Sequence, residues 1–91
     1  MINADYSGRE DVIKAFILAE FLPGEDPEAL TSTTPLIITG VLDSIATIKL
    51  VAFLEETFEV SIAAHEVGVE HLNTIDAMVV LIAAKKSQGA P

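Results

Sequence analysis

Hydrophobic residues recur at helical spacing in the first quarter of the chain. They are Val12, Ile13, Phe16 and Ile17. Ser7 and Glu10, just before them, have the spacing of a capping box, in which two side chains bond free backbone groups at a helix start. Because Pro23 disfavours helical geometry in the residue before it, and turn-forming residues follow, a helix is predicted over residues 8–22.

A second helix is predicted over residues 44–59, and its apolar side chains fall into two stripes. One, the core stripe, consists of Leu50, Val51, Leu54 and Phe58. The other, the outer stripe, consists of Ile45, Ile48 and Ala52 and begins beside Ser44. Because a domain of this size has one small core, it cannot bury both faces of one helix. The outer stripe is therefore predicted to stay exposed in the free protein.

The segment after the second helix predicts a short helical turn and a helix cap. A turn over residues 63–67 would be broken by Gly68, after which Leu72 would pack inward. Asn73 and Asp76 then have the spacing of an N-cap and its reciprocal partner. A last helix is expected to begin there.

The apolar face of this last helix consists of Ile75, Val79 and Ile82. Lys85 and Lys86 follow near its end, where the helix dipole favours positive charge. Residues 1–6 and 87–91 are expected to be frayed ends.

A long connection, residues 23–42, joins the first two predicted helices. Such loops are commonly functional or disordered, but this one has enough apolar residues to lie across a core: Leu30, Leu36, Ile37, Ile38, Val41 and Leu42. A short buried strand at PLIITGVL is the alternative, which periodicity alone does not exclude. Because no second strand is evident to pair with it, a loop in an all-α domain spanning residues 1–91 is favoured.

Charge and composition narrow the function. The 14 acidic and five basic residues give a net charge of −9, which repels both phosphate backbones and anionic lipid headgroups. We therefore expect no nucleic-acid or membrane partner, but a protein partner with a basic patch. The longest apolar run, AMVVLIAA, is shorter than the roughly 20 residues that span a bilayer. The opening MINADYSGRED does not read as a signal peptide, so a cytoplasmic protein is expected.

The chain has no cysteine, which excludes disulfides, thiolate metal sites and cysteine nucleophiles. Any thiol chemistry must then come from a cofactor. His65 and His71, six residues apart, match no metal or catalytic template. We expect no metal site.

Asp43 and Ser44 stand side by side where the second helix begins, and both are preferred N-cap residues. A simple cap is the plainest interpretation of the pair. If Asp43 alone caps the helix, however, Ser44 is its first residue and the hydroxyl is left free at the positive end of the helix dipole, a position suited to a phosphate ester. A hydrolase nucleophile is disfavoured because the G-x-S-x-G pattern is absent.

The segment GVLDSI, followed by a helix ending FLEETF, resembles the acyl and peptidyl carrier protein family, whose hallmark is an Asp-Ser-Leu/Ile motif at the start of the second helix. The resemblance extends through TTPLIITGVL, LVAFLEETFEVSI and HLNTIDAM to nearly the whole chain. It implies a monomeric four-helix bundle with a long loop between helices one and two and a short third helix. It also implies that Ser44 carries a 4′-phosphopantetheine arm, with Asp43 positioning it, and that the protein is not itself an enzyme.

By the same resemblance, a phosphopantetheinyl transferase, an adenylating ligase or acyltransferase, and a downstream condensing or transfer enzyme are the expected partners. The second helix is the part that such enzymes grip. The expected docking residues are Leu42, Ile45, Ile48, Lys49 and Ala52.

One departure from the family bears on the cargo. Fatty-acid carriers commonly place acidic residues two and five positions after the modified serine, where this chain has Ala46 and Lys49. The pattern looks more like free-standing peptidyl and D-alanyl carrier proteins, and it favours an aminoacyl or small acyl cargo in a secondary-metabolite pathway. Two alternatives remain: a fatty-acid or polyketide acyl carrier, and an unmodified acidic helical adaptor that binds a partner through the outer stripe.

Overall fold

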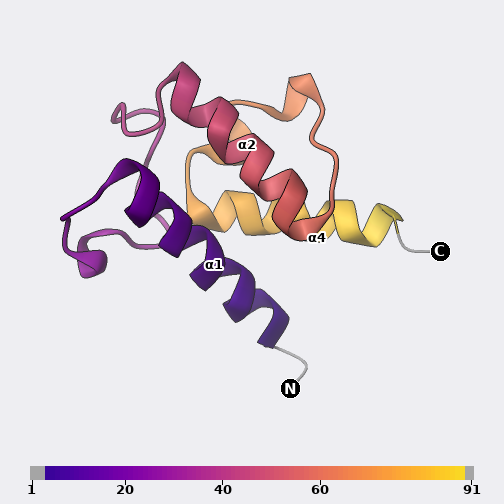
Figure 1. Cartoon of the computed structure of the whole chain (residues 1–91). Helices are drawn as coiled ribbons and strands as arrows, with labels where there is room; N and C mark the ends of the chain where they lie inside the picture. Colours follow the sequence, from indigo (N-terminus) through magenta and orange to yellow (C-terminus); the bar gives the residue numbers. More distant parts are fainter. Residues whose placement is uncertain (1–3, 90–91) are drawn as a thin grey trace.

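The computed structural model describes residues 4–89, which fold as a small all-α bundle, as predicted (Figure 1). The α-helices are α1 (Ala4–Phe21), α2 (Ser44–Phe58), α3 (Val69–Leu72) and α4 (Ile75–Gly89). Two 3₁₀ turns, η1 (Pro27–Ala29) and η2 (Ala64–Glu66), lie in the connections. No strand occurs among these residues, so the alternative of a strand at PLIITGVL is excluded.

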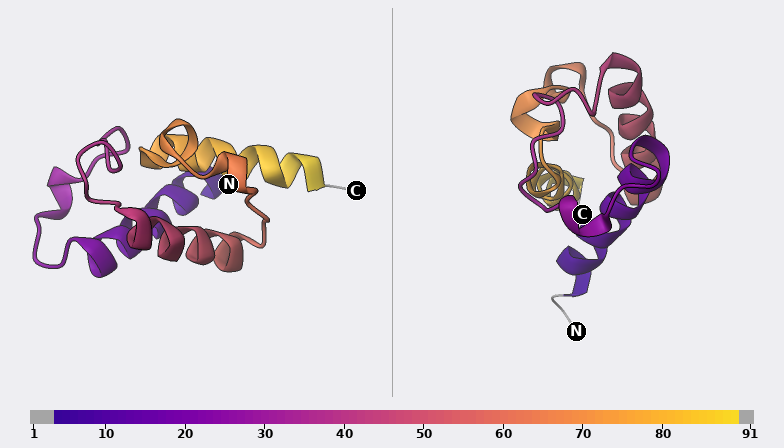
Figure 2. Two further views of the ribbon diagram at one scale, coloured as in Figure 1. Left: turned by 90° about the horizontal axis from the view of Figure 1, so that it is seen from above. Right: turned by 90° about the vertical axis from the view of Figure 1, so that its left-hand side faces the viewer.

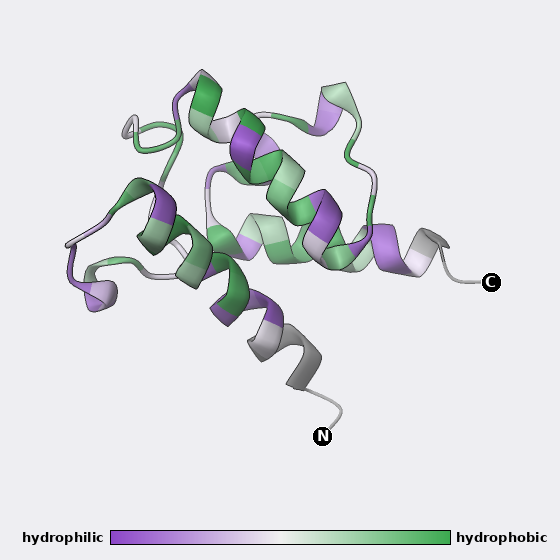
Figure 3. Ribbon diagram, in the orientation of Figure 1, coloured by the Kyte–Doolittle hydropathy of each residue, from purple (hydrophilic) through white to green (hydrophobic). Residues whose placement is uncertain are grey.

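The core is one cluster of aliphatic side chains supplied by every long helix and by the loop. Its fully buried members are Ile13, Ile17, Leu36, Leu50, Leu54, Leu72, Ile75, Met78 and Ile82. The face predicted for the last helix therefore points inward, as does Leu72. When the ribbon is coloured by hydropathy, hydrophobic residues appear along α1, α2 and α4 (Figure 3). The beginning of α2 is also hydrophobic.

Helix α1 begins earlier than the sequence pattern indicated. Ser7 lies within α1, which starts at Ala4, so the capping box of Ser7 and Glu10 is wrong. Residues 4–7 contain no glycine or proline, the two residue types that most disfavour a helix interior, so the helix can extend back to Ala4. Likewise α4 continues through residues 87–89, where fraying was expected. Residues 1–3 and 90–91, also expected to fray, lie outside the described part of the chain.

The long loop crosses the core as predicted, at the end of the bundle where α4 begins (Figure 2). Leu30, Leu36 and Leu42 are buried beneath it. The backbone N–H of Asp76, in the first turn of α4, donates to the carbonyl of Ser32 at 3.0 Å. The loop is therefore attached to the bundle by both apolar contacts and hydrogen bonds.

The predicted capping role of Asn73 is wrong. Thr74 caps α4, because its Oγ1 accepts the backbone N–H of Ala77 at 3.1 Å. Asn73 instead ends α3, and its side-chain oxygen accepts backbone N–H groups of the long loop. The spacing of Asn73 and Asp76 was therefore a coincidence of local sequence.

The turn expected over residues 63–67 is present as η2, and Lys85 of α4 forms an ion pair with Glu66 in it. Glu66 also accepts the backbone N–H of Ala63 at 2.8 Å. The hydrogen bond from Lys85, helped by the one from Ala63, lowers the pKa of Glu66 below its ordinary value. This charged pair joins the end of α4 to the turn that precedes α3.

Candidate functional site

Asp43 is the N-cap of α2, as predicted. Its backbone is extended, and Oδ1 accepts the backbone N–H of Ala46 at 2.8 Å. The Thr47 hydroxyl donates to the Asp43 carbonyl, also at 2.8 Å, and so closes the same turn from the other side. With the cap supplied by Asp43, Ser44 becomes the first residue of the helix.

The Ser44 side chain is exposed and unused by the fold. None of the hydrogen bonds found among the described residues involves its hydroxyl. Because the first backbone N–H groups of a helix lack intrahelical partners, negative charge placed on this oxygen is favoured by the helix end. A phosphate ester can thus be attached at this position without the loss of a hydrogen bond between described residues.

A shallow, mainly apolar hollow of about 430 Å³ adjoins Ser44. Three segments line it: the long loop, the first turns of α2 and the turn before α3. The lining residues are Ile37, Leu42, Asp43, Ser44, Thr47, Ile48, Val67 and Gly68. The contributions of Ile37 and Val67 were not predicted, because an apolar residue in a loop carries no local sign of whether it lines a surface hollow or packs in the core.

The outer stripe is exposed, as predicted. Ile45 and Ile48 each keep 68% of their surface, and Ala52 is also exposed, whereas Leu50 and Leu54 are fully buried. Val51 and Phe58, the other members of the core stripe, are half-buried and pack against the core. The two faces of α2 are therefore clearly divided.

Of the expected docking residues, Leu42 is the exception. Its side chain is 2% exposed and belongs to the core, because the loop turns inward immediately before the helix. Leu42 can therefore shape the hollow but cannot offer a docking surface in the free protein. Lys49, by contrast, is exposed.

Lys49 and Ala52 also line a shallow groove of about 350 Å³ between α1 and α2. Phe16 of α1 and Phe53 of α2 share the groove, with ring centroids 3.9 Å apart and planes 10° from parallel. Glu20 and Glu56 line it too, so Lys49 shares the groove with two carboxylates. The aromatic pair joins the two helices and was not predicted.

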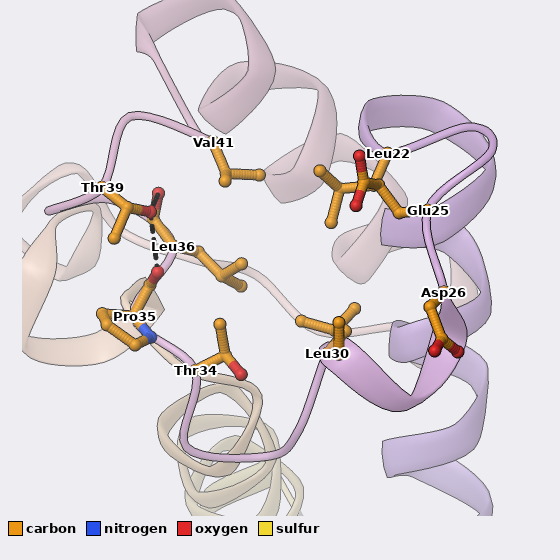
Figure 4. A pocket seen from close by; sticks show the side chains of 10 residues that line it. Leu22, Glu25, Asp26, Leu30, Thr34, Pro35, Leu36, Thr39 and Val41 are labelled. Atoms are coloured by element: carbon orange, nitrogen blue, oxygen red, sulfur yellow. Dashed lines mark hydrogen bonds between the residues drawn. The ribbon is translucent and has the colours of Figure 1, made fainter.

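A smaller hollow, about 180 Å³, lies between the end of α1 and the long loop (Figure 4). Three leucines and Val41 are among the residues that line it, and the Thr39 hydroxyl donates to the Pro35 carbonyl at 2.8 Å beside it. Neither Asp43 nor Ser44 lines this hollow.

The described residues contain no group of histidine and carboxylate side chains able to hold a metal ion, and His65 and His71 belong to no such group. Within the same part of the chain, no helix has the length and apolar character needed to cross a membrane.

Residues 16–82 match the family model described as the phosphopantetheine attachment site. The chain belongs to the acyl and peptidyl carrier protein family. The carrier is 37% identical over 71 residues to the probable acyl carrier protein PigG of Serratia sp. (strain ATCC 39006), an alignment that covers 78% of this chain and 80% of the relative. It also matches a chain of a solved structure described as "Crystal structure of FAD-dependent dehydrogenase", with a TM-score of 0.70 and 31% identity, over 77% of this chain and 97% of the other.

Members of this family carry 4′-phosphopantetheine covalently on a serine, so this carrier does as well. The group supplies a terminal thiol, which this cysteine-free chain lacks. The start of α2 fits such a group, since it offers an exposed hydroxyl, unpaired helix amides and an adjoining apolar hollow.

Replacing Asp43 by alanine is expected to lower the free energy of unfolding by about 0.5 to 2 kcal/mol, because the N–H of Ala46 loses its acceptor. Modification by a phosphopantetheinyl transferase should also slow, since Ser44 is held less firmly. Urea denaturation and a timed mass measurement test the two effects. Unchanged stability together with an unchanged rate would show that Asp43 does not hold Ser44.

Proposed function

We propose that this carrier holds an aminoacyl group as a thioester on a 4′-phosphopantetheine arm attached to Ser44, and passes it between enzymes of a secondary-metabolite pathway. The supporting observation is the free Ser44 hydroxyl, which Asp43 leaves unused by capping α2 itself. The carrier is the substrate of its partner enzymes rather than a catalyst.

The positions of the other serines favour Ser44 as the attachment point. Ser7 and Ser87 lie inside helices, and both fall outside the stretch that matches the family model. Ser32 lies in the long loop and Ser61 follows α2. Only Ser44 begins a long helix, where the backbone N–H groups favour a phosphate ester.

Attachment requires one bond exchange at Ser44. Its oxygen forms a bond to the β-phosphorus of coenzyme A, and the bond from that phosphorus to the adenosine 3′,5′-bisphosphate leaving group breaks. The hydroxyl proton passes to a base of the transferase or to water. The start of α2 then stabilises the negative charge of the phosphodiester.

Ala46 and Lys49, which follow Ser44 in α2, support an aminoacyl cargo over a fatty acyl one. Ala46 is 8% exposed, so the position where fatty-acid carriers commonly present an acid faces the core. Lys49 presents positive charge at the second such position. An enzyme that must place a basic residue against this one position would lose the attraction of an acid and meet the like charge of Lys49, although the chain as a whole is acidic. Such a local mismatch rejects a wrong partner more effectively than a good match rewards another.

A polyketide or other acyl cargo is the second candidate, and the similarity to a probable acyl carrier protein supports it. The two candidates share the same arm and the same serine. They differ in the enzyme that loads the thiol, which is an adenylating ligase for an amino acid and an acyltransferase for an acyl group.

The proposed docking surface is the outer stripe with Lys49. The enzymes expected to bind it are the transferase, the loading enzyme and a downstream condensing or transfer enzyme. Because the matched solved chain comes from a structure described as an FAD-dependent dehydrogenase, an enzyme of that class that oxidises the attached cargo is a further candidate partner.

A loading experiment tests the cargo. The protein modified at Ser44 is incubated in parallel with a fatty-acid malonyl transferase and with the adenylating ligases encoded near its gene, and its intact mass is followed. We expect an aminoacyl adduct with a ligase and little malonyl adduct. Efficient malonyl loading with no aminoacyl adduct would instead establish the acyl alternative.

A further inference from the structure

Asn73 lies at the junction of α3 and α4, yet its side chain is bonded to the loop that leads to Ser44. Its Oδ1 accepts the backbone N–H groups of Leu36, Ile37 and Ile38, at 3.1, 2.9 and 3.2 Å. Its backbone carbonyl accepts the N–H of Leu36 as well, at 2.7 Å. One residue thus fixes three consecutive amides of the loop.

The fixed segment adjoins the modification site in two ways. The N–H of Leu42, the residue before Asp43, donates to the carbonyl of Leu36 at 2.9 Å. Ile37, the middle residue of the fixed segment, lines the same hollow as Ser44. Both the approach to the α2 cap and one wall of the hollow therefore depend on where Asn73 holds the loop.

Local sequence offers these amides little else. The segment 35–40 forms turns rather than a helix or strand, so no regular ladder bonds its N–H groups. Removing the Asn73 oxygen would leave the Ile37 and Ile38 amides without their acceptor. The bond to Ile37 is partly buried, so its loss is costly, whereas the Ile38 amide is exposed to solvent. The loop would then move to find water.

We propose that Asn73 is a positioning residue for the modification of Ser44. It acts through the loop. By holding the loop, it keeps the hydrogen bond between Leu42 and Leu36, and the side chain of Ile37 in the hollow, in the arrangement that the transferase recognises. The proposal rests on the role of Ser44 given above. It assigns no contact between Asn73 and the arm.

An oxygen acceptor is the chemical requirement at this position. Asn73→Leu keeps the branched shape of the side chain but replaces its amide by methyl groups, so the acceptor is removed. Asn73→Asp keeps an oxygen in the same place, and a carboxylate accepts N–H bonds more strongly than an amide does. Thr74→Ala is a matched control, because it destabilises the same junction by removing the α4 cap but leaves the loop bonds in place.

The test measures the rate of phosphopantetheine transfer from coenzyme A by a broad-specificity transferase, with the carrier concentration varied. Loss of loop order lowers the fraction of carrier that can be recognised, and the apparent affinity falls by the same fraction. We expect Asn73→Leu to raise KM for the carrier roughly tenfold or more with kcat little changed. Asn73→Asp and Thr74→Ala should stay close to the wild type.

Three results would overturn the proposal: wild-type kinetics for Asn73→Leu, a KM for Asn73→Asp as high as that for Asn73→Leu, or an equal rise in KM for Thr74→Ala. If circular dichroism shows that Asn73→Leu does not fold, Asn73→Ser replaces it, since its shorter side chain cannot reach all three amides and the same rise in KM is expected. Wild-type protein that takes up no group on Ser44 would contradict the proposed function itself, whereas normal uptake with unaffected Asn73 variants contradicts only the positioning role.

Discussion

Ser44→Ala is expected to gain no mass when incubated with coenzyme A, magnesium and a phosphopantetheinyl transferase, whereas the wild type gains one phosphopantetheinyl group. The substitution removes the hydroxyl at the start of α2, which is exposed and free of hydrogen bonds to described residues. Since no such bond is lost, the helical content measured by circular dichroism should be unchanged. Intact-mass spectrometry gives the answer directly.

Ser61→Ala is the matched control for this measurement, because Ser61 is also exposed and lies within the stretch that matches the family model. It should be modified like the wild type. Labelling that persists in Ser44→Ala, or that disappears in Ser61→Ala, would move the attachment point away from α2. A wild type that remains unmodified would instead favour the unmodified adaptor.

Leu54→Ala is expected to lower the free energy of unfolding by about 2 to 5 kcal/mol, as large-to-small changes at fully buried positions do. Domains of this kind are stable by only about 5 to 15 kcal/mol, so the variant should lose a large share of its stability. Urea denaturation followed by circular dichroism measures the loss. A change below about 1 kcal/mol would mean that Leu54 is not tightly packed.

Ile48→Glu, on the opposite face of the same helix, provides the contrast. Ile48 is 68% exposed, so its replacement should change stability by no more than about 0.5 kcal/mol. Loading by the cognate ligase should nevertheless weaken, because exposed apolar side chains beside a reactive group commonly mark a docking surface. Normal loading of Ile48→Glu would exclude the outer stripe as the docking surface.

Helix α2 could be predicted almost to the residue because its signals are local. Asp43 is close enough in sequence to Ala46 to cap it, and the spacing of Leu50 and Leu54 gives the buried face directly. The exposure of Ile45 and Ile48 followed from the same periodicity. The same local signals offered the free Ser44 hydroxyl as one interpretation of the Asp43-Ser44 pair, beside a simple cap.

The features that the sequence did not reveal depend on partners distant in the chain. Asn73 bonds amides 35 to 37 residues away, and spacing within one segment carries no sign of this. The short spacing between Asn73 and Asp76 suggested instead that Asn73 caps α4, a role that Thr74 fills. Likewise, Leu42 looked available for docking because its burial results from the path of the whole loop.

The exposed outer stripe has a consequence for how copies of this protein meet each other. An exposed apolar face favours association of identical molecules. Each copy carries a net charge of −9, however, so the copies repel one another. A partner with a basic surface is attracted by the same charge, which makes the face available to other proteins while discouraging self-association. Concentrated salt screens the repulsion and strengthens apolar contacts, so copies of the carrier should associate more readily as the ionic strength rises.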